Sequence, residues 1–117
     1  MASVQVKYVA IPHQHGLQFL LLQEIVAIEA GRSYCVFHMY DGQKHTVSRS
    51  LSWAEARLAN LGYCRPHRSW LVNPAHVRAL TRTQGHQLHL SNGMQVPVSE
   101  QSRERVMEWI KTIALGA

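Results

Sequence analysis

The chain lacks most of the features that mark membrane, secreted or disulfide-rich proteins. No apolar run is longer than four residues, the length of Phe19–Leu22, which is far short of the roughly 18 residues that a membrane-spanning helix needs. The first ten residues have no basic stretch followed by an apolar core, so they are not a secretory signal. Cys35 and Cys64 are too few for a disulfide framework and too far apart for a CxxC metal site. We therefore expect a cytoplasmic protein with reduced thiols in its core and no contact with a membrane.

Sequence patterns typical of catalysis are missing as well. The chain contains no Gly-x-Ser-x-Gly, no HExxH and no glycine-rich phosphate loop. Cys64 and His67 stand three residues apart in a segment predicted to be extended, where such side chains project to opposite faces. Residues 56–99 contain no Asp or Glu to serve as a general acid or base. We expect no enzymatic activity and no cofactor.

Eight histidines in 117 residues raise the hypothesis of a metal site. Their spacing does not support it. His13 and His15 share one turn and supply at most half of a tetrahedral site. His86 and His89 lie in and beside the turn at Gly85, with no cysteine or carboxylate close in the sequence. Solvated loop histidines are the better interpretation, and we expect no metal site.

Positive charge is concentrated in one part of the chain, whose net charge is +5. Residues 1–55 hold four basic and four acidic groups, and residues 100–117 hold three of each. The whole excess therefore lies in residues 56–99, which contain five arginines and four histidines. Charge segregated in this way is typical of proteins that bind a phosphate-rich partner. The alternative is an ordinary solvated surface with scattered arginines.

Most of the chain reads as short strands separated by turn residues. Asp41-Gly42 and Asn92-Gly93 are the strongest hairpin signals, because such dipeptides favour the tight turns that join antiparallel strands. Residues 12–16 are predicted to form the first turn. Strands are predicted over residues 4–11, 17–22, 25–29, 34–39, 44–47, 65–72, 76–83, 87–90 and 94–98.

Two helices interrupt these strands. Ser52-x-x-Glu55 has the form of a capping box that opens a helix over residues 53–61, and Gly62 is placed to end it. A second helix is predicted from Ser99, whose hydroxyl can cap the first turn, to about residue 113. The pattern predicts an α+β, mostly β fold with about ten short, mainly antiparallel strands and two helices. We expect one domain over residues 1–117, with a core of about 4–113.

The segment "RPHRSWLVNPAHVRAL", residues 65–80, resembles the signature of the LytTR family, bacterial DNA-binding domains usually found at the C-terminus of response regulators. On the N-terminal side, "EIVAIEAGRSYCVFHMYDG" resembles the family's strand–loop–strand unit and "HTVSRSLSWAEARL" its strand leading into the first helix. On the C-terminal side, "LHLSNGMQVPVSEQSRERV" resembles its closing hairpin and last helix. The similarity covers roughly residues 4–110.

This resemblance implies a compact β fold that places loops, rather than a recognition helix, into DNA grooves. It implies a two-component transcription regulator that binds paired direct repeats in promoter DNA, often as a homodimer, and bends the DNA. We expect no receiver domain in this chain, which is either a stand-alone member or a fragment. A regulatory signal would then arrive through a separate protein, a ligand or the level of expression.

The resemblance also implies three segments that face DNA: a loop in one major groove, a residue in the minor groove and a second major-groove segment. In that order, their residues are Arg32, Ser33 and Tyr34, then Asn73, then Ser99, Glu100 and Gln101.

The second major-groove segment departs from the family pattern at Glu100, where an arginine is common. A carboxylate is repelled by phosphates and can accept a hydrogen bond from a cytosine amine but not pair with a guanine edge. We expect Arg103, one turn along the helix, to supply the missing guanidinium.

The basic residues that open the signature have two expected roles. Arg65 and His67 are expected to contact DNA, while Arg68 and Ser69 support the neighbouring loops, since alternation forbids all from pointing the same way. A different function remains open, namely a protein-interaction or dimerisation module of antiactivator type with weak or no specific DNA binding. Steep, salt-dependent binding to a specific duplex would favour DNA binding. Its absence, together with a stable protein complex, would favour the interaction module.

Overall fold

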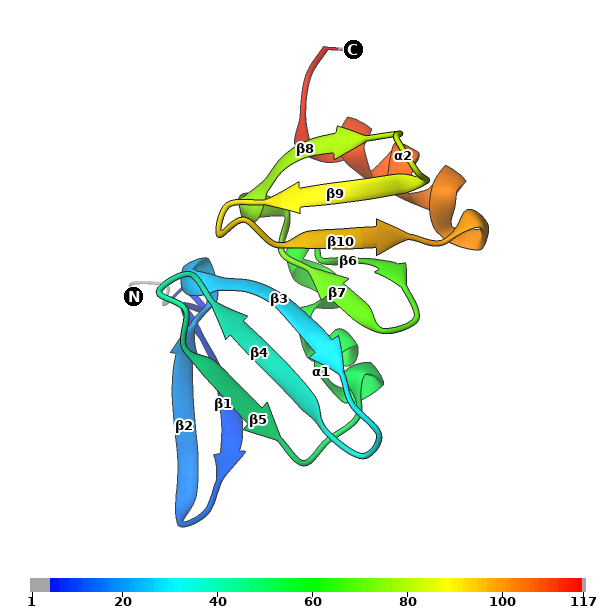
Figure 1. Ribbon diagram of the computed structural model, residues 1–117. Coiled ribbons are helices and arrows are strands. Elements are labelled where there is room, and N and C mark those ends of the chain that lie inside the picture. Colours follow the sequence, from blue (N-terminus) through cyan, green and yellow to red (C-terminus); the bar gives the residue numbers. More distant parts are fainter. Residues whose placement is uncertain (1–4, 117) are drawn as a thin grey trace.

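Ten strands in three antiparallel sheets and two α-helices make up the described part of the chain, residues 5–116 of this computed structural model (Figure 1). A two-stranded ribbon joins β1 (Tyr8–His13) and β2 (Gly16–Leu21). The second sheet has five strands in the order β5-β4-β3-β7-β6, and the third has three in the order β10-β9-β8. Their bounds are β3 Ile25–Ala30, β4 Cys35–Met39, β5 Lys44–Val47, β6 Cys64–His67, β7 Trp70–Val72, β8 Val77–Thr81, β9 His86–Leu90 and β10 Gln95–Val98. The predicted α+β, mostly β fold is confirmed.

Strand β3 lies in the middle of the five-stranded sheet and is buried on both of its faces. Its first four residues are completely shielded from solvent. Ile25 and Ile28 belong to one hydrophobic cluster, and Val26 and Ala27 belong to another. The register shifts between Ile25 and Ala27, and this bulge explains why two neighbouring residues face the same cluster. The sheet therefore needs a covering layer on each side.

Different elements cover the two faces. The β1–β2 ribbon and α1 (Leu51–Leu58) cover one face, to which they contribute Ile11 and Leu58. The three-stranded sheet and α2 (Arg103–Ile113) cover the other, to which they contribute Leu88 and Val106. In Figure 1 the three-stranded sheet and α2 lie above the five-stranded sheet, and the ribbon projects at the lower left.

A buried histidine connects the two halves. His76 ends a short 3-10 turn, Pro74–His76, and only 8% of its surface is exposed. Its Nε2 atom lies 2.7 Å from the Gln23 carbonyl oxygen, and its Nδ1 atom lies 2.6 Å from Ser91 Oγ. Because a carbonyl only accepts, Nε2 donates to it, and Nδ1 is left to accept from the hydroxyl. The ring thus connects the turn before β3 to the β9–β10 hairpin.

The hairpins predicted at Asp41-Gly42 and Asn92-Gly93 are both present, with a φ of 91° at Gly42 and 88° at Gly93. The single strand predicted over residues 65–72 is wrong. It is a hairpin in which β6 and β7 flank a turn at Arg68 and Ser69. The Nδ1 atom of His67 accepts the Ser69 backbone N–H at 3.1 Å, so a side chain stabilises the reversal.

The first strand begins later than predicted, at Tyr8, and Val4 lies outside the described residues. The strand also continues through Pro12 to His13, which leaves a two-residue turn where residues 12–16 were predicted.

The start predicted for α1 is also wrong. The N-cap is Ser50, whose hydroxyl accepts the Trp53 backbone N–H at 3.1 Å. Ser52 lies inside the first turn, and its hydroxyl instead accepts a hydrogen bond from Arg65. The end is as predicted, since a 3-10 turn, Ala59–Leu61, closes at Gly62 with a φ of 83°.

The second helix starts with a 3-10 turn, η4 (Glu100–Ser102), and continues as α2. The cap predicted from Ser99 is absent, because its hydroxyl donates to Ser102 Oγ at 2.8 Å instead. Val106 is buried, and Trp109 packs beside it while its indole N–H donates to the Gly62 carbonyl at 2.7 Å. This bond fixes α2 against the end of α1.

Both cysteines are buried free thiols, as predicted. Burial raises the pKa of Cys35 and of Cys64 to about 11, so both stay protonated and unreactive at neutral pH. Within residues 5–116, no helix is both long and apolar enough to cross a membrane.

The two candidate caps of α1 can be separated by mutation. Replacing Ser50 with alanine removes the acceptor for the Trp53 N–H, and we expect the free energy of unfolding to fall by about 1 kcal/mol. Ser52→Ala is the matched control, because its hydroxyl makes only an exposed bond of 3.2 Å. Urea unfolding followed by circular dichroism measures both variants. An equal or larger loss in Ser52→Ala would favour the capping box instead.

Candidate nucleic-acid interface

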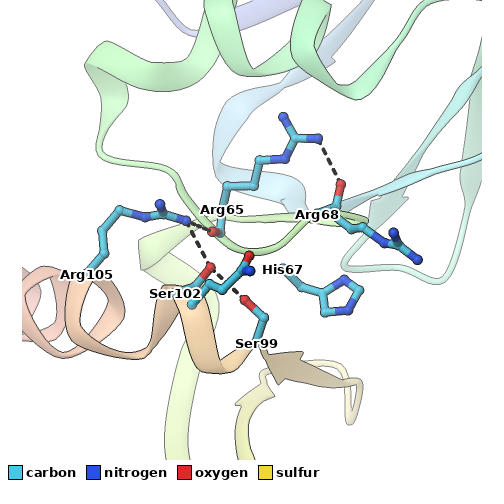
Figure 2. A pocket seen from close by; sticks show the side chains of 7 residues that line it. Arg65, His67, Arg68, Ser99, Ser102 and Arg105 are labelled. Carbon is cyan, nitrogen blue, oxygen red and sulfur yellow. Dashed lines mark hydrogen bonds between the residues drawn. The ribbon is translucent and has the colours of Figure 1, made fainter.

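A basic groove lies where the β6–β7 hairpin meets the end of β10. The Ser99 backbone N–H donates to the Pro66 carbonyl at 2.9 Å and so joins the two elements. The groove encloses about 480 Å³ and has no acidic side chain in its wall (Figure 2). Its lining residues are Arg65, His67, Arg68, Ser99, Gln101, Ser102 and Arg105. The structure thus brings together two segments that the sequence analysis treated separately.

Arg105 holds the two walls of this groove together. Its Nη2 atom donates both to the Arg65 carbonyl at 2.6 Å and to Ser102 Oγ at 3.1 Å. Ser102 Oγ also accepts from the Ser99 hydroxyl, so three side chains form one chain of hydrogen bonds (Figure 2). Sequence reasoning missed Arg105 and Ser102. The bond between Arg105 and Arg65 spans 40 residues, so no local spacing signals it.

Arg65 and Arg68 differ in how their side chains are held. The Arg65 guanidinium donates to Glu55 Oε1 at 2.9 Å, to Ser52 Oγ at 3.2 Å and to the Arg68 carbonyl at 2.8 Å. Its charge is paired and its direction is fixed. The Arg68 side chain is exposed, and Figure 2 shows its guanidinium directed away from that of Arg65. Arg68 is therefore the better placed of the two for an external anion.

His67 presents one ring nitrogen to the groove. Its Nδ1 atom accepts from the Ser69 backbone, so in the neutral ring the proton is on Nε2. An Nε2–H group at the wall of a basic groove can donate to a phosphate oxygen. Ser69 also acts through its backbone, because its carbonyl accepts the Ala30 N–H at 2.8 Å.

That bond brings the β3–β4 loop to the same edge. Arg32, Ser33 and Tyr34 are all exposed there. The loop closes on itself where the Gly31 N–H donates to the Tyr34 carbonyl at 2.8 Å, and the Tyr34 ring lies over Gly31. A Cβ atom at residue 31 would come within 2.3 Å of that ring, so any other residue there requires the exposed Tyr34 side chain to shift. The loop, the β6–β7 turn and η4 form a row down the right-hand side of Figure 1.

A second basic group extends the row beyond η4. His86 pairs with Val98 at the end of β10 and so lies close to residues 99–101. Partial burial, and then the positive charges of Arg103 and Arg82, lower the pKa of the His86 imidazole. Arg103 and Arg82 therefore lie close enough to His86 to disfavour its protonated form. Arg82 and His86 both belong to the basic segment, residues 56–99.

Asn73 lies elsewhere. It follows β7 at the end opposite the Arg68–Ser69 turn, and only 5% of its surface is exposed. Its side-chain amide donates to the Ile25 carbonyl at 2.7 Å and to the Leu22 carbonyl at 3.2 Å, while its oxygen accepts the Ala75 N–H at 3.0 Å. All three bonds are internal, so the side chain positions the chain before β3.

A β scaffold that gathers a basic groove and exposed polar loops on one edge is typical of a domain that binds nucleic acid. The sequence model of the LytTr DNA-binding domain matches residues 15–111, and the chain therefore belongs to the LytTR family of DNA-binding domains, which serve transcription regulation. The resemblance found in residues 65–80 is thereby confirmed.

A solved LytTr DNA-binding domain from Bacillus cereus has the same fold. It superposes with a TM-score of 0.76 at 22% sequence identity, over 91% of this chain and 98% of that one. No sequence among curated proteins matches the chain.

The internal role of Asn73 predicts a loss of stability on mutation. Asn73→Ala leaves the Ile25 and Leu22 carbonyls without this donor, and we expect the free energy of unfolding to fall by about 1–3 kcal/mol. Asn60→Ala, at an exposed position after α1, is the control and should change stability by less than about 0.5 kcal/mol. Thermal and urea unfolding measure both. Wild-type stability combined with lost DNA affinity in Asn73→Ala would instead show a direct contact.

The His86 environment predicts how pH affects binding. In the free protein, the lowered pKa of His86 means that the unfolded chain takes up the imidazole proton at a higher pH than the folded chain does. Protonation of His86 therefore lowers the free energy of unfolding as pH falls through about 6.5. A phosphate between His86 and Arg103 reverses the sign, because it favours the protonated ring. We expect affinity for DNA to rise from pH 8 to pH 6, and His86→Gln to flatten this rise. Fluorescence anisotropy at constant ionic strength measures it, with exposed His15→Gln as the control. A rise that His86→Gln leaves intact would contradict this assignment.

Proposed function

We propose that the chain is a sequence-specific transcription regulator that places the β3–β4 loop and residues 99–101 into neighbouring major grooves of double-stranded promoter DNA. Membership of the family supports DNA binding as such. The alignment of the two loops on either side of the basic groove, along one edge of the molecule, is the observation that carries the finer proposal.

The size of the domain supports this arrangement. It measures 44 × 41 × 24 Å along its principal axes. One turn of B-form DNA is about 34 Å long, so an edge of this length can follow a full turn and reach two successive major grooves. The narrow third dimension suits a molecule that lies along the duplex on its edge.

Each segment has a proposed task. Arg68 and His67, at the groove between the loops, contact phosphates, which position the domain without reading sequence. Arg32 and Tyr34 in one loop and Gln101 in the other read bases. Arg65 does not contact DNA in this proposal. Its ion pair with Glu55 and its bond to the Arg68 carbonyl hold the hairpin in place.

Glu100 and Arg103 together set the second contact. Both side chains are exposed at the start of the helical segment, in η4 and α2 respectively. Arg103 supplies the positive charge that Glu100 lacks, while Glu100 can accept a hydrogen bond from a cytosine amine. We infer that this pair shifts the preferred sequence away from guanine at that position.

Residues 1–117 are proposed to act as one DNA-binding unit, and two units are proposed to occupy paired direct repeats as a homodimer.

Glu100 also motivates a second candidate function, that of a protein-interaction module that no longer recognises specific bases. A carboxylate exposed in a major-groove segment would weaken binding to any duplex in which it meets a phosphate.

The deciding experiment is a fluorescence-anisotropy titration against duplexes selected from a random library, repeated at several salt concentrations. An enriched motif with paired direct repeats, bound far more tightly than scrambled DNA, supports the regulator. Absence of binding, together with a stable protein complex, supports the interaction module. Binding without an enriched motif would contradict sequence-specific recognition while leaving phosphate contact in place.

Two arginine variants test the groove and the start of the helical segment beside it. We expect Arg68→Ala to reduce the slope of log affinity against log salt by about 0.9, the value of one phosphate contact. Arg103→Ala should weaken binding to the selected motif and also relax its preferred sequence. Arg78→Ala is the matched control, because Arg78 is exposed near the start of β8 and donates only to the carbonyls of Ala75 and Val77. An unchanged salt slope in Arg68→Ala would exclude the groove as a phosphate contact, and unchanged affinity and preferred sequence in Arg103→Ala would exclude the helix start as a base contact.

A further inference from the structure

A second cavity lies beside the basic groove, between α1 and α2, with the start of β6 as its floor. It encloses about 340 Å³, near the lower end of the range for pockets that bind small molecules. Arg65 and Arg105 line both this cavity and the basic groove, so the two hollows adjoin at these arginines. The cavity, called the helix pocket below, is lined by Glu55, Tyr63, Cys64, Arg65, Arg105 and Trp109.

The charges in the helix pocket do not cancel. Arg65 Nη1 lies 2.9 Å from Glu55 Oε1, so this ion pair accounts for one charge of each sign. Arg105 has no carboxylate partner within residues 5–116. Over the same residues, only its Nη2 atom makes hydrogen bonds, which leaves Nη1 and Nε as available donors. The helix pocket therefore contains one uncompensated positive charge.

The other walls of the helix pocket are uncharged, and one of them is fixed. Trp109 donates its indole N–H to the Gly62 carbonyl at 2.7 Å, which holds the ring in place. Burial is the main cause that raises the pKa of Cys64 to about 11, while Arg105 lowers it and Glu55 raises it. Burial also raises the pKa of Tyr63. A ligand here meets an aromatic wall, a neutral floor and a single cation.

We propose that the helix pocket binds a small aromatic monocarboxylate, whose ring packs against Trp109 and whose carboxylate pairs with the Arg105 guanidinium. A planar ring suits the indole, because aromatic rings attract one another when they stack or tilt. A guanidinium can donate to both oxygens of one carboxylate. A second anionic group on the ligand would be repelled by Glu55, so one carboxylate is the best match.

Such a ligand competes for a group that holds the basic groove together. Arg105 Nη2 bonds to the Arg65 carbonyl and to Ser102 Oγ, and Figure 2 shows these bonds between the walls of the groove. A carboxylate that draws the guanidinium into the helix pocket weakens both bonds and loosens residues 99–101. The ligand should therefore lower the affinity for DNA. DNA should in turn lower the affinity for the ligand by the same factor. This regulatory effect rests on the proposed function, whereas the ligand site itself does not.

A titration of the whole chain with naphthoate, followed by NMR of the indole N–H groups, tests the site without DNA. The Trp109 signal, assigned from Trp109→Phe, should shift and saturate with a dissociation constant of about 1 mM or lower. The signals of Trp53 and Trp70 should not shift, since neither residue lines the helix pocket. Uncharged naphthamide should bind about tenfold more weakly or worse, because it cannot form the ion pair.

Arg105→Gln should weaken naphthoate binding by about tenfold or more for the same reason. Lys111→Gln is the matched control, because it removes an exposed cation from the same helix outside the helix pocket, and it should bind like wild type. Circular dichroism checks the fold of both variants. The absence of a Trp109 shift at about 10 mM naphthoate would overturn the proposal. Equal binding of naphthamide by the wild-type chain, which involves no variant, would also overturn it.

Fluorescence anisotropy with a selected duplex tests the regulatory effect. Saturating naphthoate should weaken DNA binding by about fivefold or more, and naphthamide at the same concentration and ionic strength should leave it unchanged. Unchanged DNA affinity despite a shifted Trp109 signal would overturn the coupling between the two hollows. A chain that binds no duplex would overturn the proposed function together with the coupling, while the Trp109 signal would still decide the ligand site. The two failures are therefore distinguishable.

Discussion

The rest of the structure depends on the burial of β3 from both sides. Because residues Ile25–Ile28 of β3 are completely buried, both faces of the sheet must be covered at this strand. It requires one covering layer from the ribbon and α1 and another from the β8–β10 sheet and α2. Hydrophobic burial is not directional, so it stacks the layers but does not fix the angle between them. Hydrogen bonds are directional, and those of His76 and Asn73 fix the orientation where the layers meet.

The candidate DNA-binding edge is a consequence of this layering. Three segments far apart in the sequence end at the same side because β3 pairs with both β4 and β7, and because the end of β10 reaches β6. The bonds that align them are mostly to backbone atoms: Ala30 to Ser69, Ser99 to Pro66 and Arg105 to Arg65. Side chains that face solvent there are consequently free to vary without disturbing the scaffold.

Much of the fold could be predicted from the sequence, but little of the site geometry could. The turns at Gly42, Gly62 and Gly93 were predictable because each depends on a backbone conformation that few other residues adopt. The choice between Ser50 and Ser52 as the cap was not, since both have the right chemistry and they differ only in that the helix begins at Leu51, directly after Ser50. The roles of Arg65 and Arg68 likewise depend on Glu55, which the fold brings from ten residues away.

The two-sided burial of β3 also bears on how fast the chain folds. Its neighbour β4 follows directly along the chain, whereas β7 comes only after α1 and β6. The bond from Asn73 to the Ile25 carbonyl connects residues 48 positions apart, and the core on each side of β3 is incomplete until that loop closes. Chain entropy must be lost before most of the burial is gained. The domain should therefore fold more slowly than a helical protein of equal length, with closure of β7 on β3 as its slow step.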